Sequence, residues 1–199
     1  HCKASIDVIE STGLYNIVGI VDQTLTENDS VFGYPIIGAD SDLPALRKLC
    51  DNAFITVGQI KSSNIRKNIF KLLLDLGFNL PSIVASTAYI GKNVSLGIGT
   101  IVMHHALVNA NSFIGENCII NTKALVEHDC AIGDNTHVST ATVINGTVKI
   151  GSDCFIGSAT SFVNNINVTN NVFIGINSLI NKSITEPGVY IGNPIRKIK

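Results

Sequence analysis

The stretch from residue 120 to residue 151, INTKALVEHDCAIGDNTHVSTATVINGTVKIG, places an aliphatic residue at every sixth position. The spacing continues in both directions, so that every sixth residue from Ile90 to Ile180 is apolar. A small or β-branched residue stands four places after each aliphatic residue, as Ala124 and Cys130 do. An α-helix does not carry this period among so many Gly, Asn and Thr residues. Hexapeptide repeats of this kind indicate a parallel β-helix.

Each six-residue unit is expected to form one short strand and one corner, with the aliphatic residue filling the interior. Gly or Asn often follows the aliphatic residue, as in the IG pairs at 114 and 132. We expect these residues to accept the unusual backbone angles of a corner. Three units close one coil, so residues three units apart stack on one face. Coil edges of this architecture are self-complementary, and we therefore expect a homotrimer.

The first part of the chain has a different pattern. Helix and strand signals alternate there, which predicts a parallel sheet in an α/β, Rossmann-like domain that binds a nucleotide sugar. The strand and Gly-rich turn that open such a domain are expected to be missing from this sequence. The predicted strands are YNIVGIVD (15–22) and NAFITVG (52–58), and the predicted helices cover Ser5 to Ser11, 45–50 and 63–77. The expected domains are 1–83, the β-helix at 84–185 and a cap or tail at 186–199.

Composition narrows the function. The chain has 199 residues, of which 45% are hydrophobic and 15% charged, and its net charge is −1. Such a balance argues against nucleic acid as the main partner, and no apolar stretch is long enough to span a membrane. The five cysteines include no CxxC pair, and Cys118, Cys130 and Cys154 share the small inward position of the repeat. We therefore expect reduced, buried thiols and a cytoplasmic protein.

The VEHDC motif interrupts the repeat on its outer side. His128 is third in its unit, so its side chain is expected to point outward or to lie at a corner. Glu127 or Asp129 could accept a proton from one ring nitrogen, which leaves the other nitrogen free to act as a general base. Gly146 occupies the same position one coil later, where its N–H could bind an oxyanion. These residue types in this pattern favour acyl transfer.

Other interpretations stay open at this point. His128 could be a solvated surface histidine on a non-catalytic β-helix that serves as a binding or scaffold module. A γ-carbonic-anhydrase-like metalloenzyme shares the β-helix but needs three histidine ligands. His104 and His105 are adjacent, have no carboxylate close in sequence and lie on another face from His128. We therefore expect no metal site, and His137 is expected near the His128 edge, in line with a ligand groove.

The run at 120–151, followed by FIGSATSFV and IGINSLI, resembles the bacterial sugar O- and N-acetyltransferases of left-handed β-helix type. These include sialic acid O-acetyltransferases and UDP-4-amino-sugar N-acetyltransferases. The motif is NT, then EHD, then HxS, and a Gly one coil after the first His. The first part of the chain resembles their nucleotide-sugar domain, and GNPIRKIK (192–199) resembles their usual C-terminal tail. The resemblance implies a left-handed β-helix and acetyl-CoA as co-substrate.

The resemblance also implies a role for each matching residue. His128 would be the general base for the attacking amine or hydroxyl, oriented by Asp129 or by Glu127. Gly146 would offer its N–H to the acetyl carbonyl, and His137 would line an acetyl-CoA groove between subunits of a trimer. Asn121 would contact the substrate or the cofactor near the base, and the implied contacts to the nucleotide sugar in the N-terminal domain are Asp22, Gly58 and Arg66. GQI at 58–60 departs from the small-residue loop that is usual there.

Overall fold

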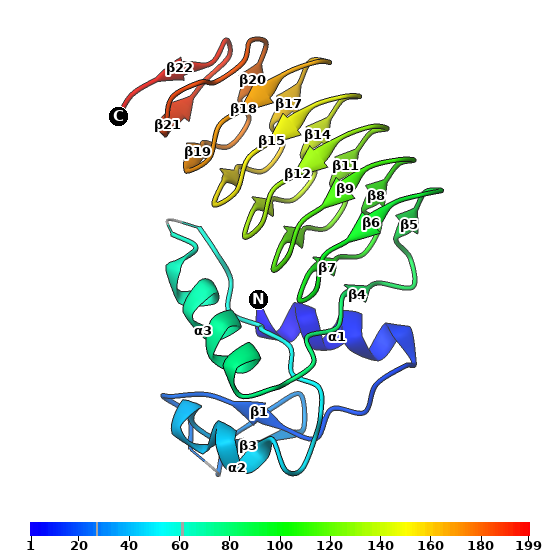
Figure 1. The fold of residues 1–199 in the computed structure, drawn as a ribbon, viewed down its shortest axis with the longest axis vertical. Coiled ribbons are helices and arrows are strands. Elements are labelled where there is room, and N and C mark those ends of the chain that lie inside the picture. Colours follow the sequence, from blue (N-terminus) through cyan, green and yellow to red (C-terminus); the bar gives the residue numbers. More distant parts are fainter. Residues whose placement is uncertain (27, 61) are drawn as a thin grey trace.

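The structure is a computed structural model that describes residues 1–26, 28–60 and 62–199. It has two parts (Figure 1). A column of stacked coils forms the long part, and an α/β part lies at the end where the column begins. Helix α3 (Asn64–Asp75) runs beside the first coils of the column. Among the described residues, no helix combines the length and the apolar character that crossing a membrane requires.

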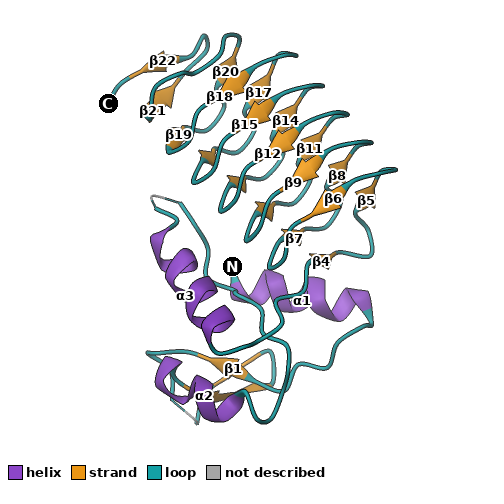
Figure 2. Ribbon diagram, in the orientation of Figure 1, coloured by secondary structure: helices purple, strands orange, loops and turns teal. Residues whose placement is uncertain are grey.

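The coils form a parallel β-helix, as the hexapeptide period predicts, with strands on three faces (Figure 2). Each strand pairs with the strand one coil later, so that Ile119 lies opposite His137 and Ile120 opposite Val138. The first face holds β4 (Ile83–Val84), β7 (Ile101–Val102), β10 (Ile119–Ile120), β13 (His137–Val138), β16 (Phe155–Ile156), β19 (Val172–Ile174), β21 (Gly188–Ile191) and β22 (Arg196–Lys197). The second holds β5 (Tyr89–Ile90), β8 (Leu107–Val108), β11 (Leu125–Val126), β14 (Val143–Ile144), β17 (Ser161–Phe162) and β20 (Leu179–Ile180). The third holds β6 (Ser95–Leu96), β9 (Phe113–Ile114), β12 (Ala131–Ile132), β15 (Lys149–Ile150) and β18 (Asn167–Val168).

The interior of the column is the aliphatic ladder of the repeat. Val108, Val126 and Ile144 stack through three coils with no exposed surface. The small position of the repeat is also inside, and burial raises the pKa of the Cys118 thiol to about 12 and that of Cys154 to about 11. A thiol with such a pKa stays protonated near neutral pH and is a poor nucleophile.

The glycines directly after the aliphatic residues do not adopt the unusual backbone angles of the corners, as was expected of them. The residues with left-handed backbone angles stand three places after the aliphatic residue, as Asn117 and Asn135 do, and not directly after it. The glycine directly after the aliphatic residue is needed for space. A Cβ atom at Gly97 would lie 2.5 Å from the backbone nitrogen of Glu116 in the next coil. Close approach of two backbones therefore selects glycine there, and the corner angles select asparagine two residues later.

The N-terminal part is only partly the sheet that was predicted. Its elements are α1 (Cys2–Thr12), β1 (Ile20–Val21), β2 (Ser30–Val31), β3 (Tyr34–Gly38), the 3-10 helix η1 (Asp40–Asp42), α2 (Leu43–Leu46) and α3. Strand β1 pairs parallel with β3, and β2 pairs antiparallel with β3. The expected helices differ from α1, α2 and α3 in their ends, most at 45–50, where α2 begins earlier and is shorter.

The predicted strand at 52–58 is wrong. The segment makes only an isolated bridge between Asn52 and Asn79. A groove of about 770 Å³ is lined by residues that include 14–24 and 50–57. A strand needs a hydrogen-bonded neighbour, and among the described residues no strand pairing joins 52–58 to β1.

The two parts are joined by apolar and polar contacts. Val8 and Ile9 of α1 pack against the first face of the column, at Ile83, Ile101 and Ile119. At the other end of the column, β21 extends the first face parallel to β19, and β22 folds back antiparallel onto β21. The tail therefore covers the last coil.

Candidate active site

His128 stands at the corner between β11 and β12, and its ring is held by the next residue. The imidazole Nδ1 lies 2.7 Å from Asp129 Oδ2. Both side chains face solvent, with exposed fractions of 54% for His128 and 48% for Asp129. Because a carboxylate only accepts hydrogen bonds, Nδ1 carries the proton and Nε2 presents its lone pair. This is the tautomer that a general base at Nε2 requires.

Asp129 is held in turn from the preceding coil. Its Oδ1 accepts a hydrogen bond of 3.2 Å from the Asn111 side-chain amide. The hydrogen bond from His128, and after it the one from Asn111, lower the pKa of the Asp129 carboxyl below its usual value. The carboxylate is therefore ionised over the pH range in which a histidine base works.

Glu127 does not contact His128. Its Oε2 accepts a hydrogen bond of 2.7 Å from the side-chain amide of Asn109, one coil earlier. The sequence left Glu127 and Asp129 as alternative partners of the imidazole. The geometry pairs the imidazole with Asp129 and gives Glu127 to the neighbouring coil.

Gly146 lies next to the Cε1 and Nε2 atoms of the His128 ring. A Cβ atom at Gly146 would stand 2.8 Å from both His128 Nε2 and His128 Cε1. The position therefore admits only glycine while the ring keeps its place. Among the hydrogen bonds of the described residues, none uses the Gly146 N–H. A donor without a partner beside a basic nitrogen is suited to an oxyanion.

His137 and Asn121 form a second cluster on another edge of the coil. His137 Nδ1 lies 2.6 Å from the backbone oxygen of Gln59, and His137 Nε2 lies 3.1 Å from the Asn121 side-chain nitrogen. The ring is 7% exposed, and burial lowers the pKa of His137 to about 4. The imidazole is therefore neutral near pH 7, with its proton on Nδ1 and its Nε2 accepting from Asn121.

No hydrogen bond or ion pair joins the two clusters within the described part of the chain. His128 follows β11, whereas Asn121 follows β10 and His137 begins β13. The structure thus brings His128, Asp129 and Gly146 together at one edge and places His137 and Asn121 at a different one. His137 does not lie beside the His128 edge within a single chain, because nine residues are half of an 18-residue coil and place it on the first face.

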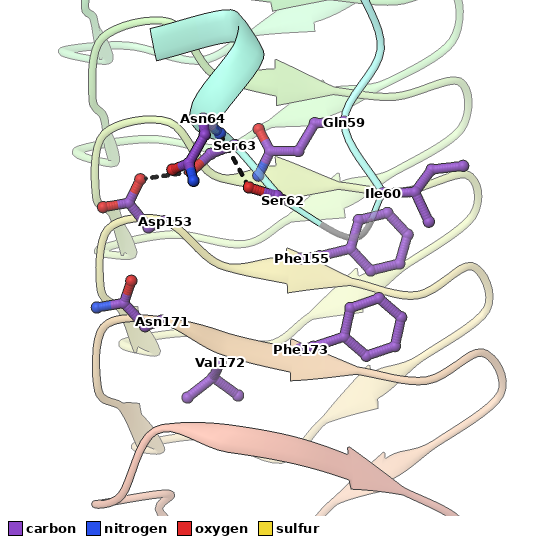
Figure 3. A pocket seen from close by; sticks show the side chains of 10 residues that line it. All are labelled: Gln59, Ile60, Ser62, Ser63, Asn64, Asp153, Phe155, Asn171, Val172 and Phe173. Atoms are coloured by element: carbon purple, nitrogen blue, oxygen red, sulfur yellow. Dashed lines mark hydrogen bonds between the residues drawn. The ribbon is translucent and has the colours of Figure 1, made fainter. Parts of the chain in front are cut away.

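A pocket of about 250 Å³ lies next to the second cluster (Figure 3). One side comes from Gln59, Ile60, Ser62, Ser63 and Asn64, and the other from the column. Phe155 and Phe173 lie along the column side with stacked rings, 4.9 Å between centroids. Ser63 reaches across and donates a hydrogen bond of 2.7 Å to Asp153. No sequence pattern had indicated this pocket, since it forms only where the N-terminal part meets the column.

Arg66 does not reach an open site, which corrects the expectation that it contacts the nucleotide sugar. The side chain is 1% exposed and extends from α3 toward the column. Its guanidinium donates to the backbone oxygens of Ile55 and Val57, at 2.9 and 2.8 Å, and to Asn117 Oδ1 at 2.7 Å. Burial lowers the pKa of Arg66 to about 10, so the group stays charged near neutral pH. Arg66 connects the N-terminal part with the column.

Of the other two predicted contacts of the N-terminal part, Asp22 is half-buried and Gly58 is exposed. Asp22 lines the groove of about 770 Å³ at the end of β1. Its Oδ1 accepts hydrogen bonds from the Thr24 backbone, the Thr24 hydroxyl and the Leu25 backbone, and these lower the pKa of Asp22. Gly58 lies next to His1, and a Cβ atom there would stand 3.4 Å from His1 Cβ.

The remaining histidines of the column hold no group with metal-binding geometry. Among the described residues, no cluster of three or more His, Cys, Asp and Glu side chains could bind a metal ion. His104 Nδ1 lies 2.8 Å from the Thr87 hydroxyl, and its Nε2 lies 3.0 Å from Asp7 Oδ2 but off the line of a hydrogen bond. Asp7 is a carboxylate that the local sequence did not bring near His104.

Comparisons with known proteins agree with this architecture. Residues 1–73 match the PglD N-terminal domain, and residues 104–199 match the GLGC left-handed parallel beta-helix domain. A search of curated proteins gave no match. The handedness that the resemblance implied is thus confirmed.

Three solved structures are similar along nearly the whole chain. PerB from Caulobacter crescentus, in complex with CoA and GDP-perosamine, is 27% identical, with a TM-score of 0.90 over 99% of this chain and 92% of that one. The acetyltransferase domain of PglB from Neisseria gonorrhoeae, in complex with acetyl coenzyme A, is 27% identical, with a TM-score of 0.90 over 99% and 93%. WeeI from Acinetobacter baumannii shares the fold at 21% identity, with a TM-score of 0.86 over 98% and 94%. The chain thus combines a PglD-type N-terminal domain with a left-handed β-helix domain, and along nearly its whole length it is similar to acetyltransferases whose structures hold CoA or acetyl-CoA.

Proposed function

We propose that this chain transfers the acetyl group of acetyl-CoA to an amine or hydroxyl of a bacterial surface-glycan sugar, and that a nucleotide-linked amino sugar is the preferred acceptor. The pairing of His128 with Asp129 over Gly146 carries the proposal, because it supplies a base and an oxyanion donor at one place. The similarity to PerB, whose structure holds CoA and GDP-perosamine, supports this acceptor class. O-acetylation of a sialic-acid-type sugar is the second candidate, supported by the sequence resemblance alone.

His128 acts as the general base. The Nδ1–H bond to Asp129 keeps the lone pair on Nε2 and stabilises the imidazolium that forms when the ring takes a proton. The acceptor amine or hydroxyl loses its proton to Nε2 as it attacks the thioester carbonyl. The new C–N or C–O bond gives a tetrahedral oxyanion. When the C–S bond breaks, the imidazolium returns the proton to the departing thiolate, and CoA leaves as the thiol.

Gly146 acts on the other reacting atom. Its N–H is free of a protein acceptor among the described residues, and the residue lies next to the Cε1–Nε2 side of the His128 ring. A donor fixed at that place stabilises the oxyanion more than the planar carbonyl, which lowers the barrier. Loss of one such donor costs about 10²–10³ in rate.

The active site is completed by a second copy of the chain. Asn121 and His137 lie on a different edge from His128, so one subunit does not assemble the whole set of residues. In a homotrimer, the edge with His128 faces the edge with Asn121 of the neighbouring subunit. Asn121 spends one amide hydrogen on His137, and its second is available for the acceptor or for acetyl-CoA. His137 then holds Asn121 in place along the acetyl-CoA groove.

The N-terminal part holds the nucleotide portion of the acceptor. Asp22 is ionised and half-buried in the lining of the large groove, which suits a contact with ribose hydroxyls. Gly58 is exposed and has no side chain, so the backbone at the end of the segment 52–58 is accessible to a ligand. Arg66 contributes indirectly, because its three hydrogen bonds fix that segment against the column.

An acceptor panel tests the proposal. Thiol release from acetyl-CoA is measured with UDP- and GDP-linked 4-amino-4,6-dideoxy sugars, with a free and an activated sialic-acid-type sugar, and without acceptor. The proposal expects saturable release with a nucleotide-linked amino sugar and a product heavier by one acetyl group. Release with the sialic-acid-type sugar alone would replace N-acetylation by O-acetylation. No release with any acceptor and no binding of acetyl-CoA would favour the non-catalytic β-helix.

A further inference from the structure

The corner that holds Asp129 belongs to a column of side chains with left-handed backbone angles. Asn93, Asn111, Asp129, Thr147 and Asn165 stand one coil apart, with φ between 59° and 63°. Asparagine and aspartate are the side chains that accept this conformation most readily after glycine. The backbone alone therefore explains why short polar residues occur here. It does not explain how their side chains are connected.

The side chains form a directed ladder that ends on the carboxylate. Asn93 donates through its side-chain nitrogen to Asn111 Oδ1 at 3.1 Å, and Asn111 donates through its own nitrogen to Asp129 Oδ1 at 3.2 Å. Asp129 is ionised and can only accept, so its presence requires the Asn111 amide hydrogens to point at it. The Asn111 oxygen must then face Asn93, which supplies a donor. Chemistry thus fixes the direction of both amides.

The ladder does not continue past Asp129. The Thr147 hydroxyl, one coil later, contacts Asn165 Oδ1 at 2.6 Å. Asp129 therefore receives its ladder contact from the side of Asn111, and its other oxygen receives the His128 Nδ1–H. An exposed carboxylate beside an exposed imidazole is free to rotate unless its second oxygen is held. Asn111 holds it.

We propose that Asn111, supported by Asn93, is a positioning residue that orients Asp129 and through it sets the tautomer of His128. This rests on the proposed function only where turnover is concerned. Asn111 touches neither acetyl-CoA nor an acceptor in this scheme. It keeps the carboxylate turned toward Nδ1, so that Nε2, next to Gly146, keeps its lone pair. A histidine side chain in water prefers the proton on Nε2, and without the ladder His128 moves toward that unproductive form.

Two variants make a matched pair. Asn111→Gly removes the amide and retains freedom for the left-handed backbone angle, so it separates the side chain from the fold. Asn165→Gly makes the same change in the same column at a residue bonded to Thr147 and not to Asp129. The thermal midpoints of the two variants show whether their effects on stability are alike.

The deciding readout is the tautomer of His128, read from its ring ¹⁵N and ¹³C chemical shifts, with His128→Ala assigning the signal among the five histidines. In the wild type and in Asn165→Gly the Nδ1–H form is expected to dominate, and in Asn111→Gly the Nε2–H form is expected to gain. With an accepted acceptor, kcat of Asn111→Gly falls about tenfold, the scale of one lost hydrogen bond, and both KM values stay within about twofold. An unchanged tautomer in Asn111→Gly, or an equal change in Asn165→Gly, would overturn the inference. The shifts need no turnover, so a failure of the proposed acyl transfer would be seen separately.

Discussion

Replacement of Gly146 by alanine separates catalysis from folding more sharply than any other change in this chain. The added Cβ atom would stand 2.8 Å from His128 Nε2 and Cε1, whereas non-bonded carbon and nitrogen atoms need about 3.5 Å. The imidazole must therefore move by about 0.7 Å. It can move, because the His128 side chain is 54% exposed. The strain is then relieved at the ring and the coil remains intact.

The displaced ring loses its place relative to both reacting groups. Its bond to Asp129, now 2.7 Å, lengthens or bends, and Nε2 leaves the position above Gly146. A misplacement of this size at a reacting centre costs about 10² in rate. We expect kcat of Gly146→Ala to fall by about 10², with the thermal midpoint unchanged.

The assay is thiol release at saturating acetyl-CoA and nucleotide-linked amino sugar, combined with thermal unfolding of the same samples. Gly157→Ala is the contrasting variant, since its Cβ atom would stand 2.5 Å from the Ile176 backbone nitrogen, which cannot move aside. That variant is expected to lose stability. Wild-type turnover in a folded Gly146→Ala protein would refute the placement of Gly146 at the reaction centre.

Further predictions concern the joint between the two parts and the trimer. Arg66→Met removes three hydrogen bonds from largely buried acceptors, including Asn117 Oδ1. The free energy of unfolding is expected to fall by about 3 kcal/mol, with part of the loss offset by removal of a buried charge. Denaturant unfolding measures this loss, and an unchanged midpoint would contradict the role of Arg66 in connecting the two parts. The pKa of His137 is about 4 in the folded protein and 6.5 in the unfolded chain, so the unfolded chain binds a proton first as the pH is lowered. The free energy of unfolding is therefore expected to decrease by about 3 kcal/mol as the pH is lowered from 6.5 to 4. Urea unfolding at pH 7 and pH 4.5 tests this, and a similar pH dependence in His137→Gln would speak against it. His128→Ala and Asn121→Ala subunits, each inactive alone, are expected to regain about a quarter of wild-type turnover when they are refolded together. A site between subunits then combines both intact residues in about one case in four. No recovery would place each site within one subunit.

The column could be predicted almost completely from the sequence, because its period is a local property. From Val102 to Ile180 the aliphatic residue of each unit is buried, so that a residue such as Val126 needs no distant partner to be assigned to the interior. The reason for the glycines could not be found in this way. The contact between Gly97 and the next coil depends on the distance between backbones, which a pattern of letters does not contain.

The N-terminal part could be predicted less well, because its sheet depends on neighbours that are distant in sequence. The segment at 52–58 has the composition of a strand, yet among the described residues it makes no strand pairing with the 15–22 segment that the alternation predicted beside it. Arg66 is a basic residue at the start of a helix, where the sequence suggested that it binds a ligand. Its contact with Asn117 arises from packing of α3 on the column and could not be seen in the sequence.

The candidate site could be predicted from the sequence to the extent that its residues follow the repeat. His128 and Gly146 occupy the same place in successive coils, so their proximity follows from the period alone. The choice between Glu127 and Asp129 required coordinates, because it depends on side-chain direction at a corner. Asn109 and Asn111, which decide that choice, looked in sequence like ordinary corner residues.

The central claim is that His128 removes the proton from the acceptor, and one comparison tests it most directly. Initial rates of thiol release are measured for wild type and for His128→Ala, with His105→Asn as the control at an exposed histidine outside the site. The account predicts a loss of at least about 10² in kcat for His128→Ala, KM values close to wild type, and wild-type rates for His105→Asn. Near-normal turnover by a folded His128→Ala protein would contradict it.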